Sequence, residues 1–185
     1  MDSMQRLFIA VEIPKKVQQE VACIQQLLRT AHLFEANYTD PKTLHITLKF
    51  LGDVQEDTIS KIHEQLQNIT IRSMRAQLDK IDFFVSGKHI KIIYLNVLCT
   101  QMAVLAQEIE TTLQDMFVME ERNFVSHITL ARIKNMYDEQ ACIQLFKDIE
   151  VKPITFSIDS FSLKKSELTP GGPMYSDVSV YELGK

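Results

Sequence analysis

The tetrapeptide His-Ile-Thr-Leu occurs twice in this chain, at residues 45–48 and again at residues 127–130. Each copy lies in a run of alternating polar and apolar residues, which is typical of a β-strand with one buried face. Residues two apart on a strand project to the same side, so each histidine shares a face with its threonine. The isoleucine and leucine of each copy then face the core. The two copies predict two strands that each present an imidazole and a hydroxyl.

The segments around the tetrapeptides follow one order twice: helix, His-x-Thr strand, helix, strand, strand. We place the two units at about residues 15–98 and 101–183, with a further strand near residues 6–13 before them. Apolar residues at three- and four-residue steps define the helices, and the last two strands are separated by the loop at residues 170–173. Two copies of one unit usually pack about a pseudo-twofold axis, which would bring the tetrapeptides together.

The bulk composition is that of a globular protein with a sizeable core. The chain has 185 residues, of which 45% are hydrophobic and 24% charged, and its three cysteines are too few and too scattered for a disulfide framework or a Cys-x-x-Cys metal site. No apolar stretch approaches the roughly 20 residues of a membrane span, and no signal peptide precedes the first strand. We therefore expect a cytoplasmic protein without a membrane association.

The net charge of −4 argues against a protein that coats long nucleic acid through its phosphates. A short or singly charged terminus remains compatible with this charge. A few positively charged side chains at the site are enough to hold such a terminus.

Two histidines and two threonines facing one space are suited to acid–base chemistry. Histidine has an ordinary pKa of about 6.5, so one neutral and one protonated imidazole can accept and donate protons near neutral pH. The hydroxyls of Thr47 and Thr129 can donate hydrogen bonds to the non-bridging oxygens of a phosphodiester, where negative charge builds during attack. A lone His-x-Thr is usually structural. Two in equivalent places favour catalysis by His45 and His127.

Other candidates for substrate binding surround these strands. Alternation puts Lys49 on the histidine face and Arg132 nominally on the opposite face, unless a loop or bulge turns the arginine inward. Phe8 and Phe50 are strand aromatics, which usually belong to the core, although one could stack on a base. Tyr175 follows the loop at residues 170–173 and could approach RNA, or simply lie in a solvated turn.

Four stretches of the chain resemble a known family, the 2H phosphoesterases. They are the opening run Arg6–Pro14, the segment Leu44–Gly52 that contains the first tetrapeptide, the second tetrapeptide, and the late stretch Leu163–Tyr175. The likeness is greatest to the bacterial and archaeal RNA 2',3'-cyclic phosphodiesterases, also called 2'-5' RNA ligases. It covers essentially the whole chain.

The resemblance implies a single α+β domain of two intertwined lobes, in which two antiparallel sheets line a central cleft and the helices lie outside. It implies that a 2',3'-cyclic phosphate on an RNA end or a small nucleotide is opened to a 2'-phosphate, without metal or nucleotide cofactor. Some members of the family run the reverse joining of RNA ends. By the same resemblance His45 is the proton donor and His127 the proton acceptor. Arg132 resembles the family arginine that holds the phosphate, and a solvated charge at a strand end is the alternative interpretation.

Three alternatives stay open. Another 2H activity, on a cyclic nucleotide, an ADP-ribose cyclic phosphate or a 2'-5' oligoadenylate, would need the same four side chains. A non-catalytic module that binds RNA ends would not need an acid and a base. A metal site on the two histidines lacks a carboxylate or cysteine at a supporting spacing. No obligate protein partner is indicated.

Overall fold

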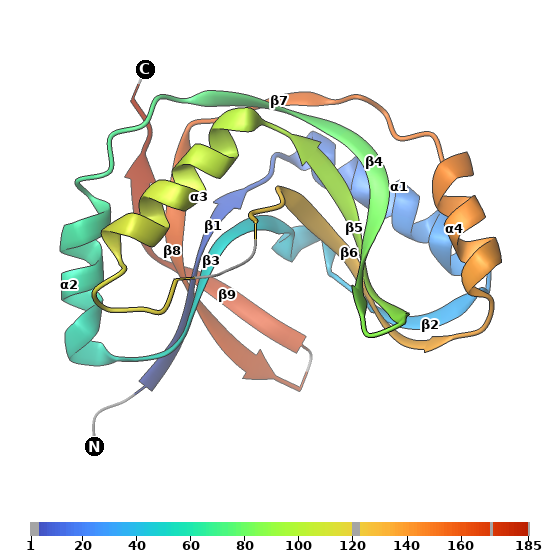
Figure 1. Cartoon of the computed structure of the whole chain (residues 1–185), viewed down its shortest axis with the longest axis horizontal. Helices are drawn as coiled ribbons and strands as arrows, with labels where there is room; N and C mark the ends of the chain where they lie inside the picture. Colours follow the sequence, from blue (N-terminus) through green and yellow to red (C-terminus); the bar gives the residue numbers. More distant parts are fainter. Residues whose placement is uncertain (1–3, 120–122, 171, 185) are drawn as a thin grey trace.

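The computed structural model describes residues 4–119, 123–170 and 172–184, and within these ranges it contains two antiparallel sheets (Figure 1). The four-stranded sheet consists, in spatial order, of β3 (His45–Gln55), β1 (Met4–Glu12), β8 (Ser160–Thr169) and β9 (Gly172–Glu182). The five-stranded sheet consists of β2 (Phe34–Tyr38), β6 (His127–Met136), β5 (His89–Leu98), β4 (Met74–Ser86) and β7 (Thr155–Ile158). The two His-x-Thr strands thus lie in different sheets.

The helices cover the outer faces of the sheets, as Figure 1 shows. The helices α2 (Glu56–Leu66) and α3 (Thr100–Thr112) pack on the side of the four-stranded sheet, and α1 (Lys15–Thr30) and α4 (Glu139–Asp148) pack on the five-stranded sheet. Each helix buries an apolar face, such as Val17, Val21 and Ile24 of α1. The expected α+β class, with two antiparallel sheets and external helices, is confirmed. No helix in the described part of the chain is long and apolar enough to cross a membrane.

The chain passes repeatedly between the two sheets. The first half contributes β2, β4 and β5 to the sheet that holds β6, while the second half contributes β8 and β9 to the sheet that holds β3. At Asp159 the chain leaves β7 in one sheet and enters β8 in the other. The sheet that holds each His-x-Thr strand is therefore completed by strands from the other half of the chain.

Two strands differ from the sequence expectation. β2 lies in a stretch expected to be a polar connection, because it is a short edge strand whose partner, β6, is distant in the sequence. A single strand was expected near residues 154–163, but the structure has β7 and β8 there, because alternation of side chains does not reveal a change of sheet. In the loop at residues 170–173, Gly171 lies outside the described residues.

Candidate active site

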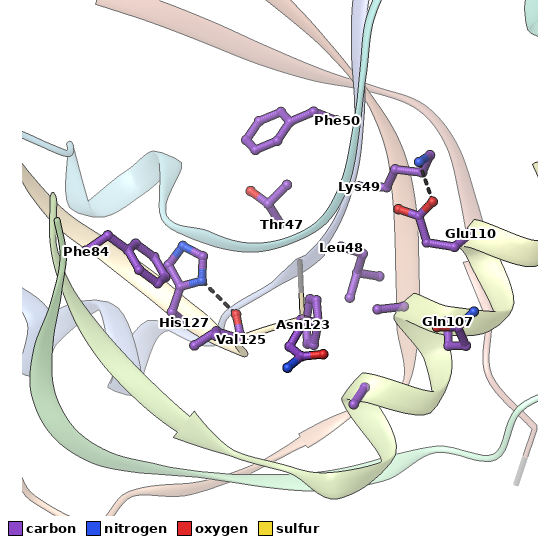
Figure 2. Close-up of a pocket in the computed structure, with 13 residues that line it drawn as sticks. Thr47, Leu48, Lys49, Phe50, Phe84, Gln107, Glu110, Asn123, Val125 and His127 are labelled. Carbon is purple, nitrogen blue, oxygen red and sulfur yellow. Dashed lines mark hydrogen bonds and ion pairs between the residues drawn. The ribbon is translucent and has the colours of Figure 1, made fainter. Parts of the chain in front are cut away.

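The two histidines are held in the same way by the backbone. His45 Nδ1 lies 2.8 Å from the carbonyl oxygen of Thr43, and His127 Nδ1 lies 2.7 Å from the carbonyl oxygen of Val125. Because a carbonyl oxygen can only accept, each Nδ1 carries the hydrogen, so Nε2 is the nitrogen that gains or loses a proton. Figure 2 shows the bond of His127. In both strands the local backbone, two residues upstream, fixes the tautomer.

Burial lowers the pKa of both histidines. For His45, desolvation has the largest effect on the pKa, and the hydrogen bond to the Thr43 carbonyl opposes it. The positive charges of Lys164 and His127 lower the pKa of His45 further, while the negative charge of Glu12 raises it. For His127, desolvation again dominates the lowered pKa, the Val125 carbonyl opposes it, and the positive charge of Arg132 lowers it further. The effect of His127 on the pKa of His45 agrees with the contacts between β3 and β6, the two strands that carry the histidines.

A β-bulge follows each His-x-Thr pair at the same place. On β3, Thr47 pairs with Ala10 and Lys49 with Ile9, so Leu48 is an extra residue. On β6, Thr129 pairs with Tyr94 and Ala131 with Ile93, so Leu130 is the extra residue. A single extra residue reverses which face the following side chains occupy.

The bulge overturns the expected place of Lys49. Its side chain is 1% exposed and points toward α3, where Nζ donates to Glu110 Oε2 at 2.6 Å and to the Val118 carbonyl at 3.1 Å. Figure 2 shows this side chain directed away from Thr47 and Phe50. The prediction that Lys49 binds substrate on the histidine face is therefore wrong. Its ammonium instead connects β3 to α3 in the interior.

The β-bulge in β6 likewise turns Arg132 toward the site. Simple alternation placed Arg132 opposite His127, and this expectation is corrected by the bulge at Leu130. The positive charge of Arg132 acts on the pKa of His127 and also opposes the rise that burial causes in the pKa of Tyr175. Within the described residues Arg132 has no ion-pair partner, and it is exposed to solvent. It therefore presents an available cation beside both half-sites.

Aromatic rings enclose the first histidine. Phe8 lies 4.9 Å from the His45 ring and 5.0 Å from Tyr175, measured between ring centroids, and Tyr175 lies 5.2 Å from His45. Phe8 is only 3% exposed, so it supports these rings but has little free face for stacking, in contrast to the expected substrate contact. Phe50 is 62% exposed and offers an open face.

The second histidine is enclosed by rings from the other sheet. Phe84 lies 5.0 Å from His127 and Tyr94 lies 5.2 Å from it, between centroids, and both meet it edge-on. These contacts explain the desolvation that lowers the pKa of His127. They also fix the plane of its ring, as the contacts of Phe8 and Tyr175 fix His45.

Two cavities adjoin the histidines. The first cavity, of about 650 Å³, lies between β3 and α3 and has Thr47, Phe50 and His127 in its wall (Figure 2). The second cavity, of about 330 Å³, is lined by His45, Phe50, Tyr175 and Arg6, among others. Phe50 is common to both. Thr129 lies half-buried on β6, on the face that it shares with His127.

A family model described as LigT like Phosphoesterase matches residues 11–94 and 99–175. This chain belongs to the LigT-like phosphoesterases. The resemblance to 2H phosphoesterases that the paired motifs indicate is thereby confirmed. Both motifs and the strands that carry them lie in the matched residues.

Curated relatives of these phosphoesterases match nearly end to end. The RNA 2',3'-cyclic phosphodiesterase of Thermotoga maritima is 30% identical over 174 residues, covering 92% of this chain and 91% of that protein. The RNA 2',3'-cyclic phosphodiesterase of Archaeoglobus fulgidus is 29% identical over 184 residues, covering 96% and 99%. That of Methanocaldococcus jannaschii is 28% identical over 173 residues, covering 92% and 96%.

Solved structures share the fold. The crystal structure of TT0787 of Thermus thermophilus superimposes with a TM-score of 0.78 at 23% identity, over 97% of this chain and 99% of that one. Escherichia coli LigT in its apo form gives a TM-score of 0.75 at 19% identity, over 99% of each chain.

Sequence reasoning missed Gln25, which shapes this LigT-like site. Gln25 of α1 is fully buried, and its Nε2 donates to the carbonyls of Thr39 at 2.8 Å and Leu130 at 2.9 Å, which holds the bulge in β6. Its only sequence signal is a polar residue beside the apolar stripe of a helix. Among the described residues, no three His, Cys, Asp or Glu side chains gather closely enough to hold a metal ion.

Proposed function

We propose that this protein is an RNA 2',3'-cyclic phosphodiesterase that opens a terminal cyclic phosphate to a 2'-phosphate. The observation that carries the proposal is the matched pair of imidazoles, each with Nδ1 bonded to a backbone carbonyl and each beside a threonine of the same strand face. An acid and a base with the same free nitrogen suit an in-line displacement, in which one proton is taken and one is given. The activity for which the curated relatives are named supports the same reaction.

The proposed reaction balances without an added reagent. Neutral His127 takes a proton through Nε2 from a water molecule as the water oxygen bonds to phosphorus. The bond between phosphorus and the 3' oxygen breaks, and protonated His45 delivers its proton to that oxygen. The products are a 2'-phosphate and a 3'-hydroxyl, and the two histidines return to their starting states by proton exchange with water. The resemblance assigns these roles.

The remaining side chains serve the phosphate and the nucleoside in this proposal. Thr47 and Thr129 donate to the non-bridging oxygens, and Arg132 neutralises the charge that builds on them. The second cavity takes the terminal nucleoside, with its base against the open face of Phe50 and against Tyr175. Because the net charge is −4, we propose that the enzyme binds an RNA terminus or a small nucleotide rather than the length of an RNA chain. Its three cysteines form no disulfide, which supports a cytoplasmic location in this proposal.

The reverse joining reaction is a second candidate, supported by two cavities that meet at Phe50. In this reaction the 5'-hydroxyl of a second RNA would take the place of water, and its oxygen would end in a 2'-5' link as the 3' oxygen leaves. The two cavities offer room for one nucleoside on each side of the phosphorus.

The deciding experiment is turnover of an oligonucleotide with a 2',3'-cyclic phosphate in excess chelator. We expect His45→Ala and His127→Ala each to lose about 10²- to 10⁴-fold in kcat, the usual contribution of a general acid or base. His89→Ala, at an exposed histidine in the five-stranded sheet, is the matched control and should retain full activity. Phosphorus NMR of the product should show a 2'-phosphate. Equal turnover by the wild type and the two site variants would overturn the proposal.

A further inference from the structure

The duplicated strands differ in charge directly beside the two histidines. On β1, Glu12 is the register partner of His45 on β3, and on β5, Asn96 is the register partner of His127 on β6. Directly opposite residues of antiparallel strands place their side chains on the same face, with Cβ atoms about 5 Å apart. The equivalent position therefore has a carboxylate beside one imidazole and a neutral amide beside the other.

Other contacts hold the Glu12 carboxylate at its position. Its Oε1 accepts from Lys164 Nζ at 2.7 Å, and the same Nζ donates to Asp177 Oδ1 at 2.5 Å. The Lys164 side chain is only 7% exposed, so this ammonium is fixed between the two carboxylates. The cluster carries one net negative charge on the same face as His45.

Asn96 is engaged differently. Its Nδ2 donates to Asp79 Oδ2 at 3.3 Å, and its Oδ1 accepts from the backbone nitrogen of Val97 at 3.1 Å. The amide itself has no charge, and the charged group that acts on the pKa of His127 is the Arg132 guanidinium, which opposes protonation.

In the described part of the chain, the titratable or charged groups that face His45 belong to four neighbouring strands. They are Glu12 of β1, Lys164 of β8, Tyr175 of β9 and His127 of β6. Lys164 and His127 oppose a positive charge on His45, and burial raises the pKa of the Tyr175 hydroxyl, which keeps it neutral. Glu12 is therefore the group in this set that favours the imidazolium, against the larger opposing effects of Lys164 and His127 on the pKa of His45.

We propose that Glu12 is a positioning residue that favours the protonated form of His45 against the opposing positive charges of Lys164 and His127. This inference rests on the proposed function, in which His45 begins the reaction protonated. A carboxylate favours the charged form of a neighbouring imidazole, whereas the guanidinium of Arg132 disfavours it at His127. Of the two half-sites, the first therefore has a carboxylate opposite its histidine and the second has a neutral amide.

The test measures the two histidines separately. Imidazole NMR titration of the intact protein gives one pKa for His45 and one for His127, assigned with the single alanine variants. In Glu12→Gln the pKa of His45 should fall, because the carboxylate is lost and Lys164 remains, while the pKa of His127 should stay the same. Glu12→Asp should restore most of the difference. Glu35→Gln, at an exposed ion-paired carboxylate of β2, changes the net charge equally and should move neither value.

The pH dependence of kcat gives a second readout. The acid must be protonated, so a lower pKa of His45 moves the alkaline limb of the profile toward lower pH. Glu12→Gln should lose about three- to tenfold on that limb, since each pKa unit is tenfold, and keep its rate on the acidic side.

Two failures are distinguishable. An unchanged pKa of His45 in Glu12→Gln, or equal shifts at both histidines, overturns the role of Glu12 even if the enzyme is active. Full activity of His45→Ala overturns the proposed function, whatever the titration shows.

Discussion

The two half-sites of this protein have the same local backbone geometry but different neighbouring side chains. The first half-site is His45 and Thr47 on β3 beside β1, and the second is His127 and Thr129 on β6 beside β5. Both have the same register, the same bulge and the same carbonyl bond to Nδ1. The comparison teaches that the matching local backbone fixes the face and the tautomer of each histidine, whereas the side chains beside the two histidines differ.

Three equivalent positions have diverged. Beside the histidines, Glu12 corresponds to Asn96. Phe50 and Arg132 are also equivalent, since each lies three residues beyond the threonine of its half-site. Phe50 presents an exposed aromatic ring, whereas Arg132 presents a guanidinium. At the preceding position, the first half-site has the buried Lys49 and the second half-site has an alanine. In the proposed function, this difference gives the pocket one end suited to a base and the other suited to a phosphate.

Loss of Arg132 should have the largest effect of the changes at these positions. We expect Arg132→Met to lower kcat/KM by about 100-fold, because a charge-assisted contact to phosphate is worth about 3 kcal/mol and each 1.4 kcal/mol is about tenfold. Arg132→Lys should recover only part of this, since lysine lacks the planar fork. Steady-state kinetics on a cyclic phosphate dinucleotide measures the loss. If Arg132→Met had the kinetics of the wild type, the contrast with Phe50 would have no catalytic meaning.

Loss of the Phe50 ring should have a smaller effect that appears mainly in KM. Stacking on a base contributes about 1–3 kcal/mol, so we expect Phe50→Leu to raise KM by about tenfold with little change in kcat. Phe50→Tyr keeps the ring and should behave as the wild type. A ribose cyclic phosphate without a base should be turned over equally by the wild type and Phe50→Leu. A tenfold defect on that substrate would show that the ring acts on something other than the base.

The smallest effect is the pH dependence of stability that the two half-sites contribute together. Burial lowers the folded-state pKa of both histidines below 6.5, so below that pH the unfolded chain binds more protons than the native protein. Stability from these groups is present above the unfolded pKa and decreases as the pH falls toward the folded values. Urea unfolding at about pH 8 and about pH 5 should show a smaller decrease in His45→Gln and His127→Gln than in the wild type. An equal decrease in all three proteins would assign the effect to other groups.

The sequence predicted the fold class and the common face of each histidine and its threonine, because both depend on local periodicity. His45 and Thr47 precede the bulge, so alternation placed them on a common face, and the same holds for His127 and Thr129. Beyond the bulge, alternation wrongly placed Lys49 on the histidine face and Arg132 on the opposite face.

The reason is that the bulge depends on tertiary contacts. The extra residue Leu130 is stabilised by hydrogen bonds to its carbonyl from the Thr39 nitrogen at 3.0 Å and from the buried Gln25, both distant in the sequence. No local pattern around residue 130 encodes them. The same applies to β2, which forms only because β6 offers an edge, and to Phe8, whose cover by Tyr175 comes from the other end of the chain.

The exchange of strands between the sheets has a consequence for synthesis on the ribosome. β1 has β3 on one side and β8 on the other, with Arg6 opposite Ser166, so its second edge stays open until nearly the whole chain has been made. At about 5–20 residues per second, this wait is on the order of 10 to 30 s. During that time an apolar strand edge can pair with other nascent chains, so efficient biogenesis depends on keeping the N-terminal segment from aggregating until its partner emerges.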